Sequence, residues 1–176
     1  MSIIEVADAW TGSGELHFCE PMLSSNSRAR KVYLSSEVNE LLTGAVADMS
    51  QWRATLQAQL DSFMDGDVIP ACLVPHKAAR AFMGLLHPVD KGIWDIRCRD
   101  PSPGLRVLGA FLAVDVFVCL TYRTRDQLGQ RADPRWEDAI NECNRLWKIL
   151  FPSFAPLTGD NLSDFLSANF VGTGNS

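Results

Sequence analysis

The sequence is poor in the features that identify common enzymes and metal proteins. It has three histidines, and its five cysteines include no C-x-x-C pair, so the ligand spacing typical of a zinc site is missing. It also has no phosphate-binding glycine loop, dinucleotide fingerprint, nucleophile elbow, H-E-x-x-H motif or EF-hand loop. We therefore expect neither a metal ion nor an organic cofactor.

Long apolar runs are missing as well. No stretch approaches the roughly 20 apolar residues of a membrane-spanning helix, and the N-terminal MSIIEVADAW has no basic segment typical of a signal peptide. These absences predict a cytoplasmic protein without membrane contact. The net charge of −5 argues against indiscriminate binding to nucleic acid. It still permits a local basic patch, because arginines are concentrated between Arg97 and Arg131.

The composition is that of an ordinary globular protein. With 176 residues, 47% of them hydrophobic, the chain is long enough for one domain with a substantial core. Each cysteine lies among apolar residues, which favours buried free thiols in a reducing compartment. A disulfide is the alternative.

The segment between Gly92 and Leu128 predicts three short strands. Their expected ranges are Ile93–Arg99, Leu105–Leu112 and Val116–Arg125. In the first strand apolar and charged residues alternate, which indicates one apolar and one charged face. The connections are too short for a crossover helix, so neighbouring strands should be antiparallel.

Arginines recur on these strands and suggest an anion site. The residues concerned are Arg97, Arg99, Arg106, Arg123 and Arg125. The planar guanidinium matches the geometry of phosphate and stays charged at neutral pH. Together these side chains could bind a nucleic-acid backbone. The alternative is a solvated sheet face on which the arginines pair with Asp95, Asp100, Asp115 and Asp126.

Helical periodicity marks two long segments. It predicts helices over Ser36–Met64 and Asp133–Phe151, with Gly44 as a point of weakness in the first. Asp133 and Pro134 suit the N-cap and first helical position. Trp136 and Trp147 lie on the apolar stripe of the second helix, which favours core packing over a partner interface. Shorter elements are expected at Glu15–Glu20 and Lys31–Leu34 (strands) and at Pro75–Leu86 and Asp160–Phe170 (helices), followed by a frayed tail.

The strand segment resembles the RelE/ParE toxin superfamily, including HigB-like members, over roughly residues 75–151. The similarity is carried by Trp94-Asp95-Ile96-Arg97, by Gly104-Leu105-Arg106, and by Phe117-Val118-Cys119-Leu120 leading to Arg123 and Arg125. It implies an α+β fold in which a small antiparallel sheet of three to four strands has helices packed on one face. We accordingly expect an N-terminal extension (1–30), a RelE-like α+β domain (31–151) and a C-terminal extension with a tail (152–176).

The resemblance also implies a function. RelE-like toxins are endonucleases that cut ribosome-bound mRNA and are neutralised by an antitoxin protein. Carried over, this makes Arg97, Arg106, Arg123 and Arg125 the groups that stabilise developing negative charge, and Tyr122 the candidate for proton transfer. Strand alternation would point Tyr122 away from Arg123, unless a bulge or strand end intervenes. Among the histidines, His87 is the best candidate acid or base.

Two other functions stay open from the sequence. The chain could be a non-catalytic binding module with the same fold that holds a protein or nucleic-acid partner. It could also be a phage or mobile-element protein that keeps only the fold.

Overall fold

The computed structural model describes residues 1–22, 28–77 and 80–174. The α-helices are α1 (Ile3–Ser13), α2 (Ser36–Thr43), α3 (Ser50–Asp65), α4 (Arg125–Leu128) and α5 (Pro134–Leu150). Short 3₁₀ helices are η1 (Ala47–Met49), η2 (Val89–Lys91) and η3 (Leu162–Asp164). The strands are β1 (Leu16–Phe18), β2 (Lys31–Ser35), β3 (Ile69–Cys72), β4 (Met83–Leu85), β5 (Ile93–Cys98), β6 (Leu105–Ala113), β7 (Val116–Thr124) and β8 (Phe170–Gly172).

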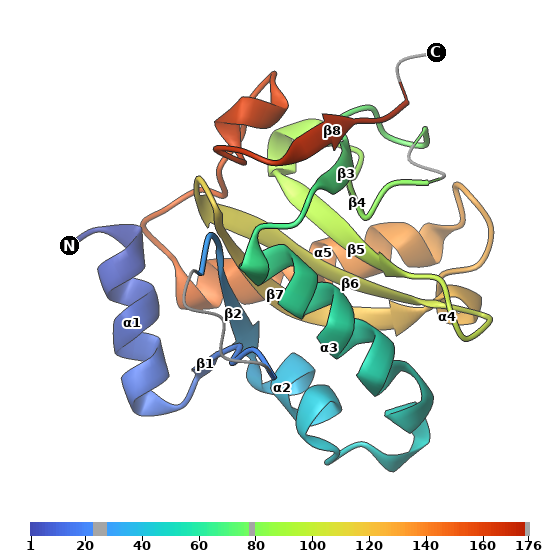
Figure 1. The fold of residues 1–176 in the computed structure, drawn as a ribbon, viewed down its shortest axis with the longest axis horizontal. Helices are drawn as coiled ribbons and strands as arrows, with labels where there is room; N and C mark the ends of the chain where they lie inside the picture. The colour runs from blue at the N-terminus through green and yellow to red at the C-terminus, as the bar shows by residue number, and fades with distance from the viewer. Residues whose placement is uncertain (23–27, 78–79, 175–176) are drawn as a thin grey trace.

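The strands form one mixed sheet of eight strands in the order β1-β2-β7-β6-β5-β4-β3-β8 (Figure 1). Its centre is the predicted antiparallel meander β5–β6–β7. Outside the meander, β2 runs parallel to β7, and β3 runs parallel to both β4 and β8. Strand β1 pairs antiparallel with β2, and β4 with β5.

Helices cover both faces of the sheet. On one face, α2 and α3 bury residues such as Leu41, Leu56 and Phe63 against Trp94 and Phe111 of the sheet. On the other, α1 and α5 bury a second set in which Trp147 and Phe151 are the largest side chains. Figure 1 shows α3 in front of the sheet and α5 behind it. The result is a three-layer arrangement in which, among the described residues, each face of the sheet packs against a large hydrophobic core.

The predicted fold is therefore wrong. The sheet is neither small nor purely antiparallel, and its helices are not confined to one face. The physical reason lies in the central strands. Strands β6 and β7 are buried on both faces over most of their length, so each face requires a covering layer. The alternation of apolar and charged residues in β5 predicted a solvent-exposed charged face. Asp95 belongs to that face but has no exposed surface, so the prediction was wrong.

Several predicted helices also need correction. The segment Ser36–Met64 contains two helices, because Gly44 ends α2 with a left-handed φ of 91° and donates its N–H to Glu40. Where a helix was expected over Pro75–Leu86, the described residues form a turn and strand β4, and positions 78–79 lie outside the described residues. Where a helix was expected over Asp160–Phe170, only the short helix η3 forms. The tail that was expected to fray starts at Val171, which is part of strand β8.

The segments expected as extensions take part in the sheet and cores. Residues 1–30 supply α1 and β1, and Ala7 and Leu16 are fully buried. Residues 152–176 supply β8 and the buried Phe165 and Leu166. All five cysteines are free and buried, as predicted. Within the described ranges, no helix is both long enough and apolar enough to cross a membrane.

Candidate functional site

Three arginines lie side by side across the central strands. Arg97 of β5 pairs in register with Arg106 of β6, which in turn pairs with Arg123 of β7. Directly paired residues of an antiparallel sheet point to the same face. That face also carries Ile93, Leu108 and other residues packed beneath α5. The arginines therefore line the end of the α5 side of the sheet.

A buried carboxylate holds two of these arginines. The Nε of Arg97 donates to both oxygens of Asp95, at 3.0 and 3.1 Å. The Nε of Arg106 lies 3.4 Å from one of the same oxygens. Asp95 is fully buried, whereas each arginine side chain keeps 14% of its surface exposed. Because the carboxylate contacts both Nε atoms, it holds the two guanidiniums beside each other.

Arg125, which directly follows β7 and begins α4, lies near Arg106. Its Nη1 donates to the carbonyl oxygen of Gly129, and its guanidinium carbon lies 5.4 Å from the ring centre of Trp136. Trp136 belongs to the first turns of α5, whose start is fixed by Asp133 as N-cap and Pro134 at the first position. The predicted cap of this helix is confirmed. The start of α5 therefore places the ring of Trp136 beside Arg125.

These side chains line a pocket of about 680 Å³. Its cationic residues are Lys91, Arg97, Arg106, Arg125 and Arg131, and two histidines, His76 and His87, also line it. Its acidic residues are Asp133 and Glu137, and Asp133 is already engaged by the Nη2 of Arg135 at 2.8 Å. The lining therefore carries an excess of positive charge in a protein that is acidic overall.

Desolvation lowers the pKa values of Arg106 and His76, which both line the pocket. Desolvation lowers the pKa of Arg106 to about 10; Asp95 opposes the shift, whereas Arg97, Arg125 and Arg99 add to it. Arg106 therefore remains charged at neutral pH. Desolvation, Arg131 and His87 lower the pKa of His76 below its ordinary value. His76 is consequently neutral at pH 7 and able to accept a proton.

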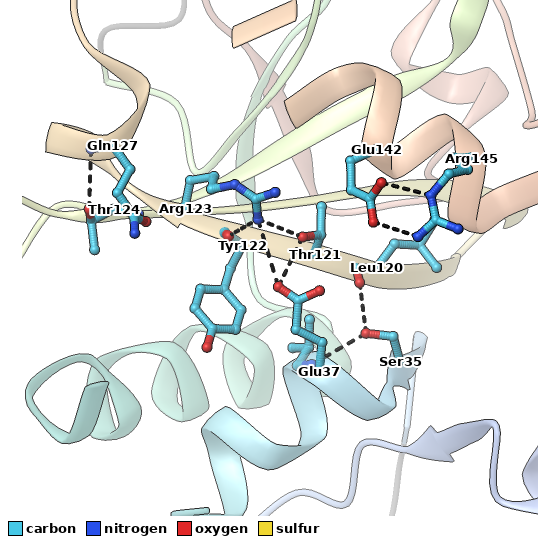
Figure 2. A network of polar contacts seen from close by, with 11 residues as sticks. Ser35, Glu37, Leu120, Thr121, Tyr122, Arg123, Thr124, Gln127, Glu142 and Arg145 are labelled. Atoms are coloured by element: carbon cyan, nitrogen blue, oxygen red, sulfur yellow. Dashed lines mark hydrogen bonds and ion pairs between the residues drawn. The ribbon is translucent and has the colours of Figure 1, made fainter. Parts of the chain in front are cut away.

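Arg123 is in register with the pocket arginines but is engaged elsewhere (Figure 2). Its Nη1 donates to Thr121 Oγ1 at 2.9 Å and to its neighbour's carbonyl at 2.6 Å, and it lies 3.7 Å from Glu37 of α2. The pairing of β2 with β7 ends at Cys119. Beyond that point α2, which directly follows β2, lies beside the edge of β7. Arg99 follows β5, outside the pocket lining, and donates to the carbonyl of Ala81 at 2.8 Å.

Tyr122 points to the other face of the sheet. It pairs with Val107 and packs against the core beneath α2 and α3, as Figure 2 shows for its ring. A bulge does interrupt the pairing of β6 and β7, but between Leu108 and Gly109, before Tyr122 is reached. Alternation therefore holds at Tyr122 and Arg123. Tyr122 does not join the arginines of the pocket.

The sequence interpretation missed several residues of the pocket. Lys91 ends the short helix η2, whereas Arg131 and His76 lie in connections. The pattern of a single strand or helix does not bring such residues together. Trp136 was treated only as a core residue. Among the described residues no cluster of three or more His, Cys, Asp or Glu side chains could hold a metal ion.

Comparisons with protein-family models, curated proteins and solved structures found no match to this chain.

Proposed function

We propose that the protein binds a small anion in this pocket, and that the anion is a phosphate group. The observation that carries the proposal is the pair Arg97 and Arg106, held on one buried carboxylate and lining a cationic pocket. Two fixed guanidiniums supply several N–H donors, and phosphate accepts such donors in paired hydrogen bonds.

The placement of the charges favours a ligand over a purely structural role. Among the described residues, the cationic side chains that line the cavity are Lys91, Arg97, Arg106, Arg125 and Arg131, against the acidic Asp133 and Glu137. The lining therefore carries an excess of positive charge. A purely structural ion pair needs no open volume beside it, whereas an anion site does.

Replacing Arg106 with Gln should weaken the binding of inorganic phosphate about ten- to a hundredfold. A hydrogen bond to a charged group contributes about 1.5–3 kcal/mol, and each 1.4 kcal/mol is a factor of ten in affinity. Isothermal titration calorimetry at neutral pH measures the change. Arg125→Gln provides a second variant that leaves the pair on Asp95 intact.

The matched control is Arg145→Gln. This arginine lies on the solvent side of α5, where it pairs with Glu142 at 2.7 Å, and it does not line the pocket. It removes the same charge from the protein and should leave phosphate binding within twofold of the wild type. Equal phosphate affinity in the wild type and in folded Arg106→Gln and Arg125→Gln variants would refute the proposal.

A second candidate function is cleavage of RNA, the activity that the RelE resemblance implies. The observation in its favour is that His76 and His87 line the same pocket as the arginines. One histidine would take the proton of a ribose 2′-OH as that oxygen bonds to phosphorus. The other would protonate the 5′-oxygen as its bond to phosphorus breaks, leaving a cyclic phosphate. A cytoplasmic location, a ribosomal substrate and an antitoxin partner belong to this candidate.

This candidate predicts cleavage of single-stranded RNA that is lost in His76→Gln and His87→Gln but retained in Tyr122→Phe. Because the pKa of His76 is lowered, its neutral form should persist below the ordinary histidine value of about 6.5. RNA cleavage should therefore decrease only when the pH falls below about 6.5. Gel analysis of the products across pH tests both points, and intact RNA at every pH would exclude the candidate.

A further inference from the structure

The pocket is lined by two chemically different groups of residues. Arg97, Arg106 and Arg125 are cationic. The apolar part of the lining consists of Leu86, Pro88, Pro134, Trp136 and Ile140. A free inorganic anion gains nothing from contact with apolar residues. A ligand with an anionic end and an apolar end would contact both groups.

The size of the pocket points the same way. Small-molecule sites typically enclose about 300–1,000 Å³. At about 680 Å³ this pocket falls within that range. A phosphate group has few heavy atoms and would fill a small part of it. The remaining volume leaves room for an organic part that contacts the apolar residues of the lining.

Trp136 supplies a hydrogen-bond donor that has no partner. Its Nε1 is buried and meets no acceptor among the described residues. Three other tryptophans donate to carbonyl oxygens, namely Trp10 to Leu150, Trp52 to Pro101 and Trp147 to Phe154. Trp94 also lacks an acceptor, but its ring lies in the core between Phe111 and Phe165. Of these two residues with an unpaired donor, only Trp136 is among those that line the pocket.

We infer that the ligand is a phosphate monoester whose organic part is a flat ring with a hydrogen-bond acceptor, the chemistry of a nucleoside monophosphate. This inference rests on the proposed function. The phosphate contacts Arg97 and Arg106, and the ring packs against the apolar lining residues Trp136 and Ile140. An oxygen or nitrogen of the ring accepts from Trp136 Nε1 after a small side-chain adjustment. Arg125, already over the ring of Trp136, provides a second flat surface for stacking.

The test compares five ligands on the full chain by calorimetry at constant ionic strength. They are inorganic phosphate, ethyl phosphate, phenyl phosphate, uridine 5′-monophosphate and benzoate. Phenyl phosphate should bind about tenfold more tightly than ethyl phosphate, because both carry the same charge but only one has a ring. Uridine monophosphate should bind at least as tightly as phenyl phosphate. Benzoate, which presents a carboxylate on the same ring, should bind more weakly than phenyl phosphate.

Two tryptophan variants separate the ring contact from a general loss of structure. Trp136→Phe keeps an aromatic ring but removes the donor, and it should weaken uridine monophosphate about tenfold, much more than it weakens ethyl phosphate. Trp10→Phe removes a tryptophan on the same side of the sheet but outside the pocket, and it should leave every affinity unchanged.

The outcomes distinguish this inference from the proposed function. If ethyl and phenyl phosphate bind equally and both depend on Arg106, the anion site stands and the ring inference is overturned. Benzoate binding more tightly than phenyl phosphate would also overturn the inference. If none of the five ligands binds, the proposed function fails and the inference fails with it.

Discussion

Replacing Trp147 with Ala should lower the free energy of unfolding by about 3–5 kcal/mol, the usual cost of deleting a large buried aromatic side chain. The side chain is 1% exposed, and its ring centre lies 4.8 Å from that of Phe151. Its Nε1 donates to the carbonyl of Phe154 at 2.8 Å, which ties α5 to the chain that follows it. Removing the ring leaves a cavity and an unpaired carbonyl. Equilibrium denaturation in urea measures the loss.

Ile149→Ala is the matched control on the same helix. Ile149 is 56% exposed, so its truncation should change the free energy of unfolding by less than about 0.5 kcal/mol. The comparison also tests whether α5 is a fixed part of the core, as the sequence predicted, or a surface for a partner. An unchanged midpoint in Trp147→Ala, together with loss of binding to a protein partner, would mean that the helix is an interface.

The parts of the fold that could be predicted are those set by local sequence. Strands β5, β6 and β7 follow from β-branched and aromatic residues between turns, and their short connections require antiparallel pairing. Helix α5 follows from its apolar period and from the Asp133-Pro134 start. In both cases the interactions that determine the element lie within a few residues.

The rest depends on contacts between distant residues. Strand β8 pairs with β3 across about a hundred positions, and only Phe170–Gly172 take part, too few for a period to show. Strand β2 pairs parallel with β7, which no turn between them could indicate. Met83–Leu85 resembles a helix end in the sequence, but its partner Trp94–Ile96 makes it a strand.

The candidate site shows the same division. The clustering of Arg97 and Arg106 follows from two neighbouring strands, so the sequence could suggest it. The burial of Asp95 beneath them could not be predicted, because it requires the layer formed by α5. Nor could the sequence show that Tyr122 lies outside the pocket, whereas Trp136 and Arg131 line it. Connections that meet in space determine the lining of the pocket.

Replacing Asp95 with Ala should cost about 3–5 kcal/mol of stability, because it removes a buried carboxylate that contacts two largely buried guanidiniums. Both arginines keep only 14% of their side-chain surface exposed, so bulk water screens their charges only in part. Arg106 stays protonated at neutral pH even though desolvation lowers its pKa to about 10. The two guanidiniums would then repel each other without the carboxylate of Asp95 to offset their charge. Urea denaturation at pH 7 measures the loss.

Added sulfate should restore part of that stability, since an anion bound only to the folded state stabilises it by mass action. If the pocket binds anions through Arg97 and Arg106, sulfate replaces the missing carboxylate, and its stabilising effect should be larger in Asp95→Ala than in the wild type. Chloride at the same ionic strength corrects for screening. Asp138→Ala removes an equal charge from the exposed side of α5 and should show neither the loss nor the added benefit. An Asp95→Ala protein that unfolds like the wild type, or that gains no more from sulfate than the wild type does, would show that Asp95 does not hold the two arginines for an anion.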